Sequence, residues 1–207
     1  RHGRLDAVLH GAGIIEDKLV VDKTPASFFR VYDTKVDSAY LLARYLQPDS
    51  LKLLVFFTSV AGRYGNRGQA DYASANETVN RLAWRLDEQW PSRVVAINWG
   101  PWDTAGMASA EVKRQFEARG VQAIALDAGR HFFTQELAYG QKGEVEIIAG
   151  AGPWGHETIP HATALDTQPN TNLSHFVLLS QQPQAQPNGT VTLNHTFSLT
   201  TEPYLAD

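Results

Sequence analysis

Four polar side chains occupy positions where reactive groups are expected: Lys35, Ser59, Tyr72 and Asn76. Tyr72 and Asn76 are four residues apart in a predicted helix, so they share one face of it. Ser59 directly follows an apolar run that is typical of a buried central strand. Lys35 lies in the apolar stripe of its own predicted helix, where an ammonium group is costly unless it reaches a cleft or a partner.

This set of groups suits the addition of hydride to a ketone. As hydride arrives at the carbon, negative charge develops on the carbonyl oxygen, so one group must donate a proton and another must hold the oxygen. The phenol of Tyr72 can donate, but its ordinary pKa is about 10, and we expect the ammonium of Lys35 to lower that pKa by favouring the phenolate. Ser59 can hold the oxygen in the manner of an oxyanion hole. Asn76 can orient a water or a side chain in a proton relay.

The elements that must position these groups are apolar strands alternating with amphipathic helices. Strands are predicted over residues 5–10, 53–58, 93–99 and 144–149, and helices over 24–46, 72–90, 109–119 and 127–139, with Thr24 and Ser109 as helix caps. This alternation predicts a parallel sheet with helices on its faces. The loops that follow its strands gather at the edge where ligands bind. They are a tight glycine turn at 11–13, a glycine-rich loop after Ser59 through Gly68, and residues 100–102.

Several ordered motifs resemble one known family. Residues 53–62 (LLVFFTSVAG) and 68–76 (GQADYASAN) resemble the ketoreductase domain of type I polyketide and fatty-acid synthases, within the short-chain dehydrogenase/reductase superfamily. In most of the superfamily a Lys stands four residues after the Tyr, whereas in synthase ketoreductases the Asn and Lys exchange places, as Asn76 and Lys35 do here. Residues 10–13 (HGAG) and 98–102 (NWGPW), followed by Gly106 and Met107, resemble the family's cofactor and substrate loops. The resemblance covers residues 5–150, and residues 61–68 (AGRYGNRG) are most similar to the iterative subfamily that makes polyunsaturated fatty acids, enediyne cores or cyanobacterial glycolipid chains.

The resemblance implies an activity and a role for each group. The activity would be NADPH-dependent reduction of a β-ketoacyl thioester to the 3-hydroxyacyl thioester, with the substrate on the phosphopantetheine of an acyl carrier protein and the other synthase domains as partners. Tyr72 would be the proton donor, tuned by Lys35, with Ser59 on the carbonyl and Asn76 in the relay. The implied cofactor contacts are His10, Gly11, Ala12, Gly13, Gly100 and Pro101, and the implied substrate contacts are Asp17, Tyr64, Trp102 and Met107.

Two substrate-side positions bear on stereochemistry. Residues 15–17 (IED) keep only the last Asp of the family's Leu-Asp-Asp motif, and Tyr64 stands where the opposite class often has Trp. Together they favour the D-hydroxyl product. Trp99 and Trp102 either line the substrate cleft or serve as packing residues, and the sequence leaves both open.

The family's phosphate-binding glycine loop, which normally opens the fold, has no counterpart after the first predicted strand, because the only Gly-x-Gly-x-x-Gly of the sequence, at residues 150–155 (GAGPWG), follows the last predicted strand instead. The expected fold class is therefore α/β, the C-terminal part of a doubly wound Rossmann-type parallel sheet with an irregular or β-rich tail. We expect residues 1–207 to be a piece of a longer polypeptide that alone neither binds NADPH tightly nor reduces ketones. Residues 1–150 would form the ketoreductase part, 151–190 a linker rich in Pro, Gln and Asn, and 191–207 the truncated start of a hot-dog dehydratase domain, which residues 197–207 (FSLTTEPYLAD) resemble.

Composition bounds the other function classes. The chain has no Cys, which excludes disulfides and Cys-based zinc sites, and its His residues show no ligand spacing, so no metal is expected. The net charge is −4 and no block of Lys and Arg forms a basic stripe, so no nucleic-acid groove is expected. The absence of a long apolar run and of a leader peptide predicts no membrane partner and a cytoplasmic location.

Each candidate also has an ordinary structural explanation. Lys35 could snorkel to the surface, Ser59 could be a turn or cap residue, and a Tyr four residues before an Asn is common. Two other functions therefore stay open: a non-catalytic structural lobe of a synthase ketoreductase, and a free-standing short-chain dehydrogenase acting on another carbonyl substrate. The complete set of four groups argues against the first. The Asn–Lys exchange and the dehydratase-like tail argue against the second.

Overall fold

The computed structural model describes residues 4–104, 106, 110–153, 184–185 and 191–192, which fall into two units, 1–156 and 157–207. In the second unit the described residues form one antiparallel pair, β5 (Gln184–Ala185) with β6 (Val191–Thr192). Most of the predicted linker (151–190) and of the predicted dehydratase start (191–207), including all of residues 197–207, lie outside the described residues.

The first unit is built on a four-stranded parallel sheet in the order β1-β2-β3-β4. Its strands are β1 (Ala7–His10), β2 (Leu53–Ser59), β3 (Arg93–Trp99) and β4 (Glu146–Ala149). The predicted parallel α/β sheet is thus confirmed, and the bounds predicted for β3 are those observed. Strands β2 and β3 pair in register from Leu53↔Arg93 to Ser59↔Trp99, so both end at the same level.

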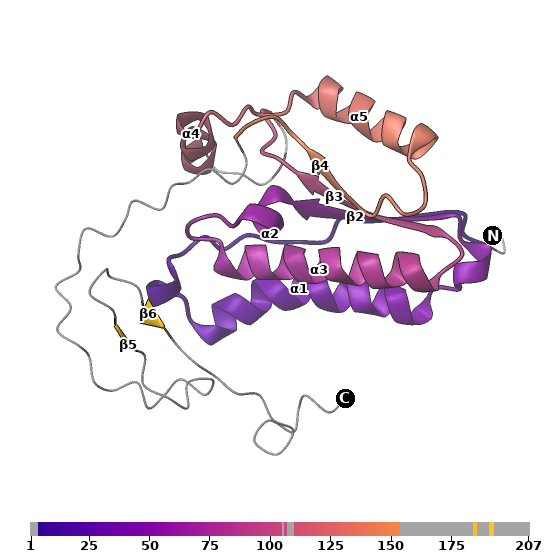
Figure 1. Cartoon of the computed structure of the whole chain (residues 1–207), viewed down its shortest axis with the longest axis horizontal. Coiled ribbons are helices and arrows are strands. Elements are labelled where there is room, and N and C mark those ends of the chain that lie inside the picture. Colours follow the sequence, from indigo (N-terminus) through magenta and orange to yellow (C-terminus); the bar gives the residue numbers. More distant parts are fainter. Residues whose placement is uncertain (1–3, 105, 107–109, 154–183, 186–190, 193–207) are drawn as a thin grey trace, which may run out of the picture. The chain divides into compact units, whose positions relative to one another are not determined.

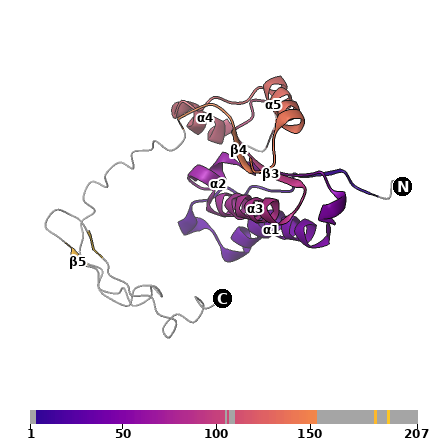
Figure 2. The ribbon, with the colours of Figure 1, turned by 45° about the vertical axis from the view of Figure 1, so that its right-hand side comes forward.

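Helices cover both faces of this sheet (Figures 1 and 2). Helices α1 (Pro25–Tyr45) and α3 (Ala70–Gln89) pack on one face, and α5 (Leu126–Tyr139) lies over the other. Since side chains alternate along a strand, Leu54 and Phe56 join the core under α1 and α3, while Val55 joins the core that includes Phe132 of α5. None of the helices in the described residues is long and apolar enough to cross a bilayer.

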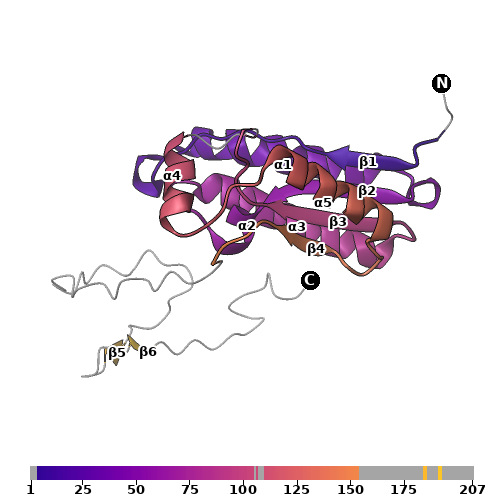
Figure 3. The same ribbon diagram turned by 90° about the horizontal axis from the view of Figure 1, so that it is seen from above.

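Local capping explains where the first long helix begins. The Thr24 hydroxyl accepts a hydrogen bond from the amide of Ser27 at 3.2 Å, and Pro25 takes the first helical position. The predicted Thr cap is therefore confirmed. The predicted Ser109 cap lies outside the described residues, and α4 (Ala110–Ala118) ends just before Gly120, which has a φ of 77°. Seen from above, α4 lies beyond the sheet at the end toward which the strands run (Figure 3).

Two loop predictions were wrong. The stretch after Ser59 does not start as a loop, because residues Val60–Tyr64 form a short helix, α2, whose first turn is capped by the Ser59 hydroxyl accepting from the amide of Ala61 at 3.2 Å. Residues 11–13 do not form a tight turn, because they run without regular structure and neither Gly11 nor Gly13 has a positive φ. Short 3₁₀ turns at Val20–Asp22 (η1) and Pro48–Ser50 (η2) complete the connections.

Close packing of α2 against α3 depends on Gly62. A Cβ at Gly62 would lie 2.9 Å from the Cβ of Asn76 and 3.0 Å from the amide nitrogen of Glu77. We predict that Gly62→Ala lowers the free energy of unfolding by about 1–3 kcal/mol, because the opposing atoms are the α3 backbone and a Cβ attached directly to it, which cannot move aside. Urea unfolding of the variant and the parent measures this change.

Gly11→Ala is the control, because no heavy atom lies within 4 Å of its added Cβ. The free energy of unfolding of Gly11→Ala should stay within about 0.5 kcal/mol of the parent. A Gly62→Ala protein as stable as the parent would refute this account of the packing.

Candidate active site

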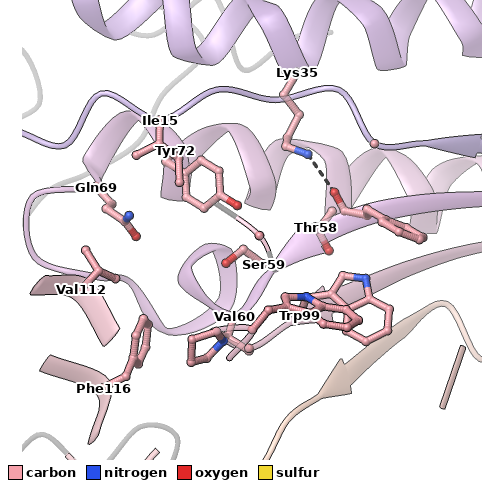
Figure 4. A pocket seen from close by; sticks show the side chains of 16 residues that line it. Ile15, Lys35, Thr58, Ser59, Val60, Gln69, Tyr72, Trp99, Val112 and Phe116 are labelled. Atoms are coloured by element: carbon pink, nitrogen blue, oxygen red, sulfur yellow. Dashed lines mark hydrogen bonds between the residues drawn. The ribbon is translucent and has the colours of Figure 1, made fainter. Parts of the chain in front are cut away.

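A pocket opens where β2 and β3 end, at the edge of the sheet that the sequence predicted. Ser59 and Trp99, the last residues of the two strands, both line it. Side chains reach it from helices on three sides (Figure 4). Its lining residues are Gly11, Ile15, Lys35, Phe57, Thr58, Ser59, Val60, Gln69, Tyr72, Trp99, Gly100, Pro101, Trp102, Gly106, Val112 and Phe116.

Tyr72 and Ser59 face one another across this pocket. The Tyr72 ring enters from the first turn of α3, and its hydroxyl points toward the side of the pocket where Ser59 lies (Figure 4). Burial raises the pKa of Tyr72 above its ordinary value, the charge of Asp17 adds to that effect, and hydrogen bonding by Ser59 and Asn76 opposes it. The phenol therefore keeps its proton at neutral pH, as a proton donor must.

Lys35 reaches the same pocket from α1. Its side chain is buried, and its ammonium donates a hydrogen bond to the carbonyl oxygen of Phe57 at 2.8 Å, drawn as the dashed line in Figure 4. Burial lowers the pKa of Lys35 to about 8. Burial dominates and raises the pKa of Tyr72, so the net acidification expected from this ammonium is not seen here, and the tuning of Tyr72 by Lys35 stays a prediction.

Asn76 is buried on α3 and is not among the residues that line the pocket. Its amide nitrogen donates to the backbone carbonyl of Tyr72 at 2.7 Å, one helical turn earlier. Its side-chain oxygen is buried and has no partner within the described residues. The relay role of Asn76 stays a prediction.

The predicted cofactor residues divide into two groups. Gly11, Gly100 and Pro101 line the pocket, and the amide of Gly100 is anchored to the carbonyl of Ala149 at 2.8 Å. His10, Ala12 and Gly13 are not among the lining residues.

His10 is instead a buried support for the end of β1. Its Nε2 lies 2.7 Å from the hydroxyl of Ser38, and its ring meets the edge of Phe56 at a centroid distance of 5.6 Å. Burial lowers the pKa of His10 to about 4, helped by the charge of Lys35, so the imidazole is neutral at neutral pH.

Among the predicted substrate residues, Trp102 lines the pocket. Its ring lies 4.8 Å from that of Trp99, and it occupies the space that a Cβ at Gly129 would need. Asp17 is outside the lining but accepts a hydrogen bond from the amide nitrogen of Gln69 at 3.0 Å, and burial raises its pKa. Tyr64 is 40 % exposed and does not line the pocket. Met107 lies outside the described residues.

Sequence reasoning missed several lining residues. Gln69 precedes Tyr72 by three residues, and its place just before a helix was the signal that could have drawn attention to it. Val112 and Phe116 are four residues apart on one face of α4, and such an apolar pair ordinarily indicates packing. No group of three or more His, Cys, Asp or Glu side chains in the described residues is arranged to hold a metal ion.

Comparison with known proteins agrees with this geometry. The model of the KR domain family matches residues 1–104. One subunit of the polyunsaturated fatty acid synthase of Thraustochytrium sp. is 33% identical over 183 residues, and the match covers 85% of this chain and 6% of that protein. The naringenin synthase of Pestalotiopsis fici is 31% identical over 168 residues, covering 79% of this chain and 6% of that synthase. The chain therefore spans only a small part of the curated relatives that it matches.

Solved structures show the same relationship. The ketoreductase from the first module of phoslactomycin biosynthesis in Streptomyces sp. HK803 superposes with a TM-score of 0.65 at 29% identity, covering 72% of this chain and 34% of that one. The first ketoreductase of the tylosin polyketide synthase gives a TM-score of 0.63 at 30% identity, covering 72% of this chain and 32% of that one. The chain belongs to the KR domain family, the oxidoreductase domains that reduce β-ketoacyl groups in polyketide and fatty-acid synthases.

Proposed function

We propose that this chain is the catalytic part of an NADPH-dependent 3-ketoacyl reductase. Its substrate is a β-ketoacyl thioester carried by an acyl carrier protein within a multidomain polyketide or polyunsaturated-fatty-acid synthase. The observation that carries the proposal is the pocket that Lys35, Ser59 and Tyr72 line together. A non-catalytic lobe would not need a cleft that reaches Tyr72, and the similarity to synthases argues against a free-standing dehydrogenase.

The pocket residues fit the nicotinamide end of the cofactor. Thr58 and Trp99 both line the pocket, and each has a buried polar atom, Oγ1 and Nε1, without a partner in the described part of the chain. Gly11 leaves open space where a side chain would stand. When bound, the nicotinamide supplies a hydride to the carbonyl carbon. The fit covers this end alone, because the only Gly-x-Gly-x-x-Gly of the sequence, at residues 150–155, comes after the last strand of the sheet, β4, and not between a first strand and its helix, where such a loop binds phosphates.

The chain's own residues handle the oxygen and the proton. Ser59 donates a hydrogen bond to the ketone oxygen and stabilises the negative charge that develops there. Tyr72, held as a neutral phenol by burial, gives its proton to that oxygen. An alkoxide is a far stronger base than a phenolate, so the transfer is favourable even though the pKa of Tyr72 is raised. Lys35 then stabilises the phenolate that is left, since opposite charges attract strongly in a buried site.

The finer features of the substrate belong to the same proposal. Asp17 and Tyr64 support a D-hydroxyl product on sequence grounds, and the D-hydroxyl is the product we propose. The order of a ketoreductase before a dehydratase would make chemical sense, since the second removes water from the product of the first.

Removing the proton donor should abolish reduction without weakening cofactor binding. In the longest polypeptide that contains this chain, we expect Tyr72→Phe to lower kcat by about 10²- to 10⁴-fold and Ser59→Ala by about 10²- to 10³-fold. Steady-state assays with a β-ketoacyl thioester measure kcat, and fluorescence titration measures the Kd of NADPH, which should barely change. Tyr139→Phe, at a 73 % exposed residue of α5, is the matched control and should behave as the parent. Near-parental turnover by Tyr72→Phe would end the assignment.

The buried ammonium should give the reaction an alkaline limb. Lys35 is protonated below its pKa of about 8 and neutral above it, so kcat for reduction should fall as pH rises through that value. Lys35→Met carries no charge at any pH, so we expect low activity throughout and no such limb. A pH profile of kcat from pH 6 to 10 for both proteins tests this. The same falling limb near pH 8 in Lys35→Met would show that another group is responsible.

A further inference from the structure

One wall of the pocket is formed by Ile15, and residues 16–18 after it each make hydrogen bonds to other parts of the fold. Ile15 lines the pocket, and the next residue, Glu16, extends its carboxylate to α1, where it accepts from the hydroxyl of Ser27 at 2.8 Å and from Nη2 of Arg30 at 2.9 Å. The hydrogen bonds to Arg30 and Ser27 lower the pKa of Glu16 to about 2, so its carboxylate is charged at neutral pH.

The opposite side of this segment is tied to the start of α3. Asp17 accepts from the amide nitrogen of Gln69 at 3.0 Å, and the backbone amide of Lys18 donates to the carbonyl of Gly68 at 2.9 Å. The wall is thus fixed between the helix that carries Lys35 and the helix that carries Tyr72.

A buried ion pair lies at the centre of these contacts. Lys23 and Asp71 are 2.5 Å apart (Nζ to Oδ2), with side chains only 3% and 1% exposed. The ammonium of Lys23 also donates to the backbone carbonyl of Glu16 at 2.7 Å, next to Ile15. The second carboxylate oxygen of Asp71 accepts from the backbone amide of Tyr72 at 2.8 Å. One carboxylate and one ammonium therefore connect the backbone of the proton donor to the wall that faces it.

Stability alone does not account for a buried pair at this place. The cost of taking two charges out of water often cancels their attraction, and replacing such a pair by apolar groups is often neutral or stabilising. A second buried carboxylate of α3, Asp87, offers the contrast. It accepts from the backbone amide of Val94 at 2.8 Å and pairs with Lys142, and none of these residues lines the pocket.

We propose that Lys23 and Asp71 are positioning residues for the reduction. They fix the distance between Tyr72 and the Ile15 wall, so that the ketone presents one face and its oxygen stays within reach of the phenol. The proposal rests on the proposed reductase function. Under this proposal, the rate of ketone reduction and the configuration of the new hydroxyl both depend on the Lys23–Asp71 ion pair, which touches neither substrate nor cofactor.

The test compares Lys23→Met, Asp71→Asn and the double variant in the longest polypeptide that contains this chain. The probe is the acetoacetyl thioester of N-acetylcysteamine with NADPH, and the readouts are kcat, KM, the enantiomer ratio of the hydroxy product and urea unfolding. We expect each single change to lower kcat by about 10- to 100-fold, since a small misplacement of reacting groups has effects of that size, and to shift the enantiomer ratio toward one to one.

The double variant should recover stability, because no charge is left buried alone. Its kcat should stay as low as that of the single variants, because either change breaks the same link.

Asp87→Asn is the matched control, since it removes a buried carboxylate at the other end of the same helix. It should lower stability but leave kcat and the enantiomer ratio within about twofold of the parent, as expected for distant, independent sites. If the single variants do not fold, the kcat and the enantiomer ratio of the double variant test the proposal by themselves.

Two results would overturn the proposal: parental kcat and enantiomer ratio in folded single variants, or recovery of both in the double variant along with stability. Tyr72→Phe in the same assay distinguishes a failure of the proposed reductase function from a failure of the positioning role alone. If Tyr72→Phe keeps its turnover, the reductase function itself fails. If Tyr72→Phe is inactive and the pair variants behave as the parent, only the positioning role fails.

Discussion

The parallel, in-register pairing of β2 with β3 is the constraint on which the rest of the site depends. Because Ser59 pairs with Trp99, both strands end at one level, and everything that follows them must leave the sheet at the same edge. There the Ser59 hydroxyl caps α2, the chain turns into α3, and Tyr72 enters the pocket from the first turn of that helix. The register of β2 and β3 therefore determines where the Ser59 hydroxyl and the Tyr72 phenol lie.

Burial is the second influence, and it acts in the same way on two groups of the site, Tyr72 and Lys35, and on His10 outside the pocket lining. Desolvation always disfavours the charged form, so it raises the pKa of Tyr72 and lowers the pKa of Lys35 and of His10. The result is a neutral phenol, a neutral imidazole and an ammonium that is protonated only up to about pH 8. The proton that we propose Tyr72 to donate is therefore in place at neutral pH.

Helix α3 is held at its two ends by buried carboxylates that do different things. Asp87 accepts from the amide of Val94 and so ties the last turns of the helix to β3. Asp71 accepts from the amide of Tyr72 and ties the first turn to Lys23 and, through it, to the pocket wall. One helix thus has a structural anchor at its end and the proposed positioning contact at its start.

Sequence alone determined the alternation of strands and helices, the parallel sheet, the Thr24 cap and the edge at which Lys35, Ser59 and Tyr72 meet, because periodicity and capping are local properties. Tertiary structure decided that α2 forms within the glycine-rich stretch and that Gln69 lines the pocket, since both depend on neighbours distant in the chain. It also decided that burial, rather than the Lys35 ammonium, governs the pKa of Tyr72. The depth at which a group is buried is set by every element packed around it, and no spacing of residues along the chain encodes that depth.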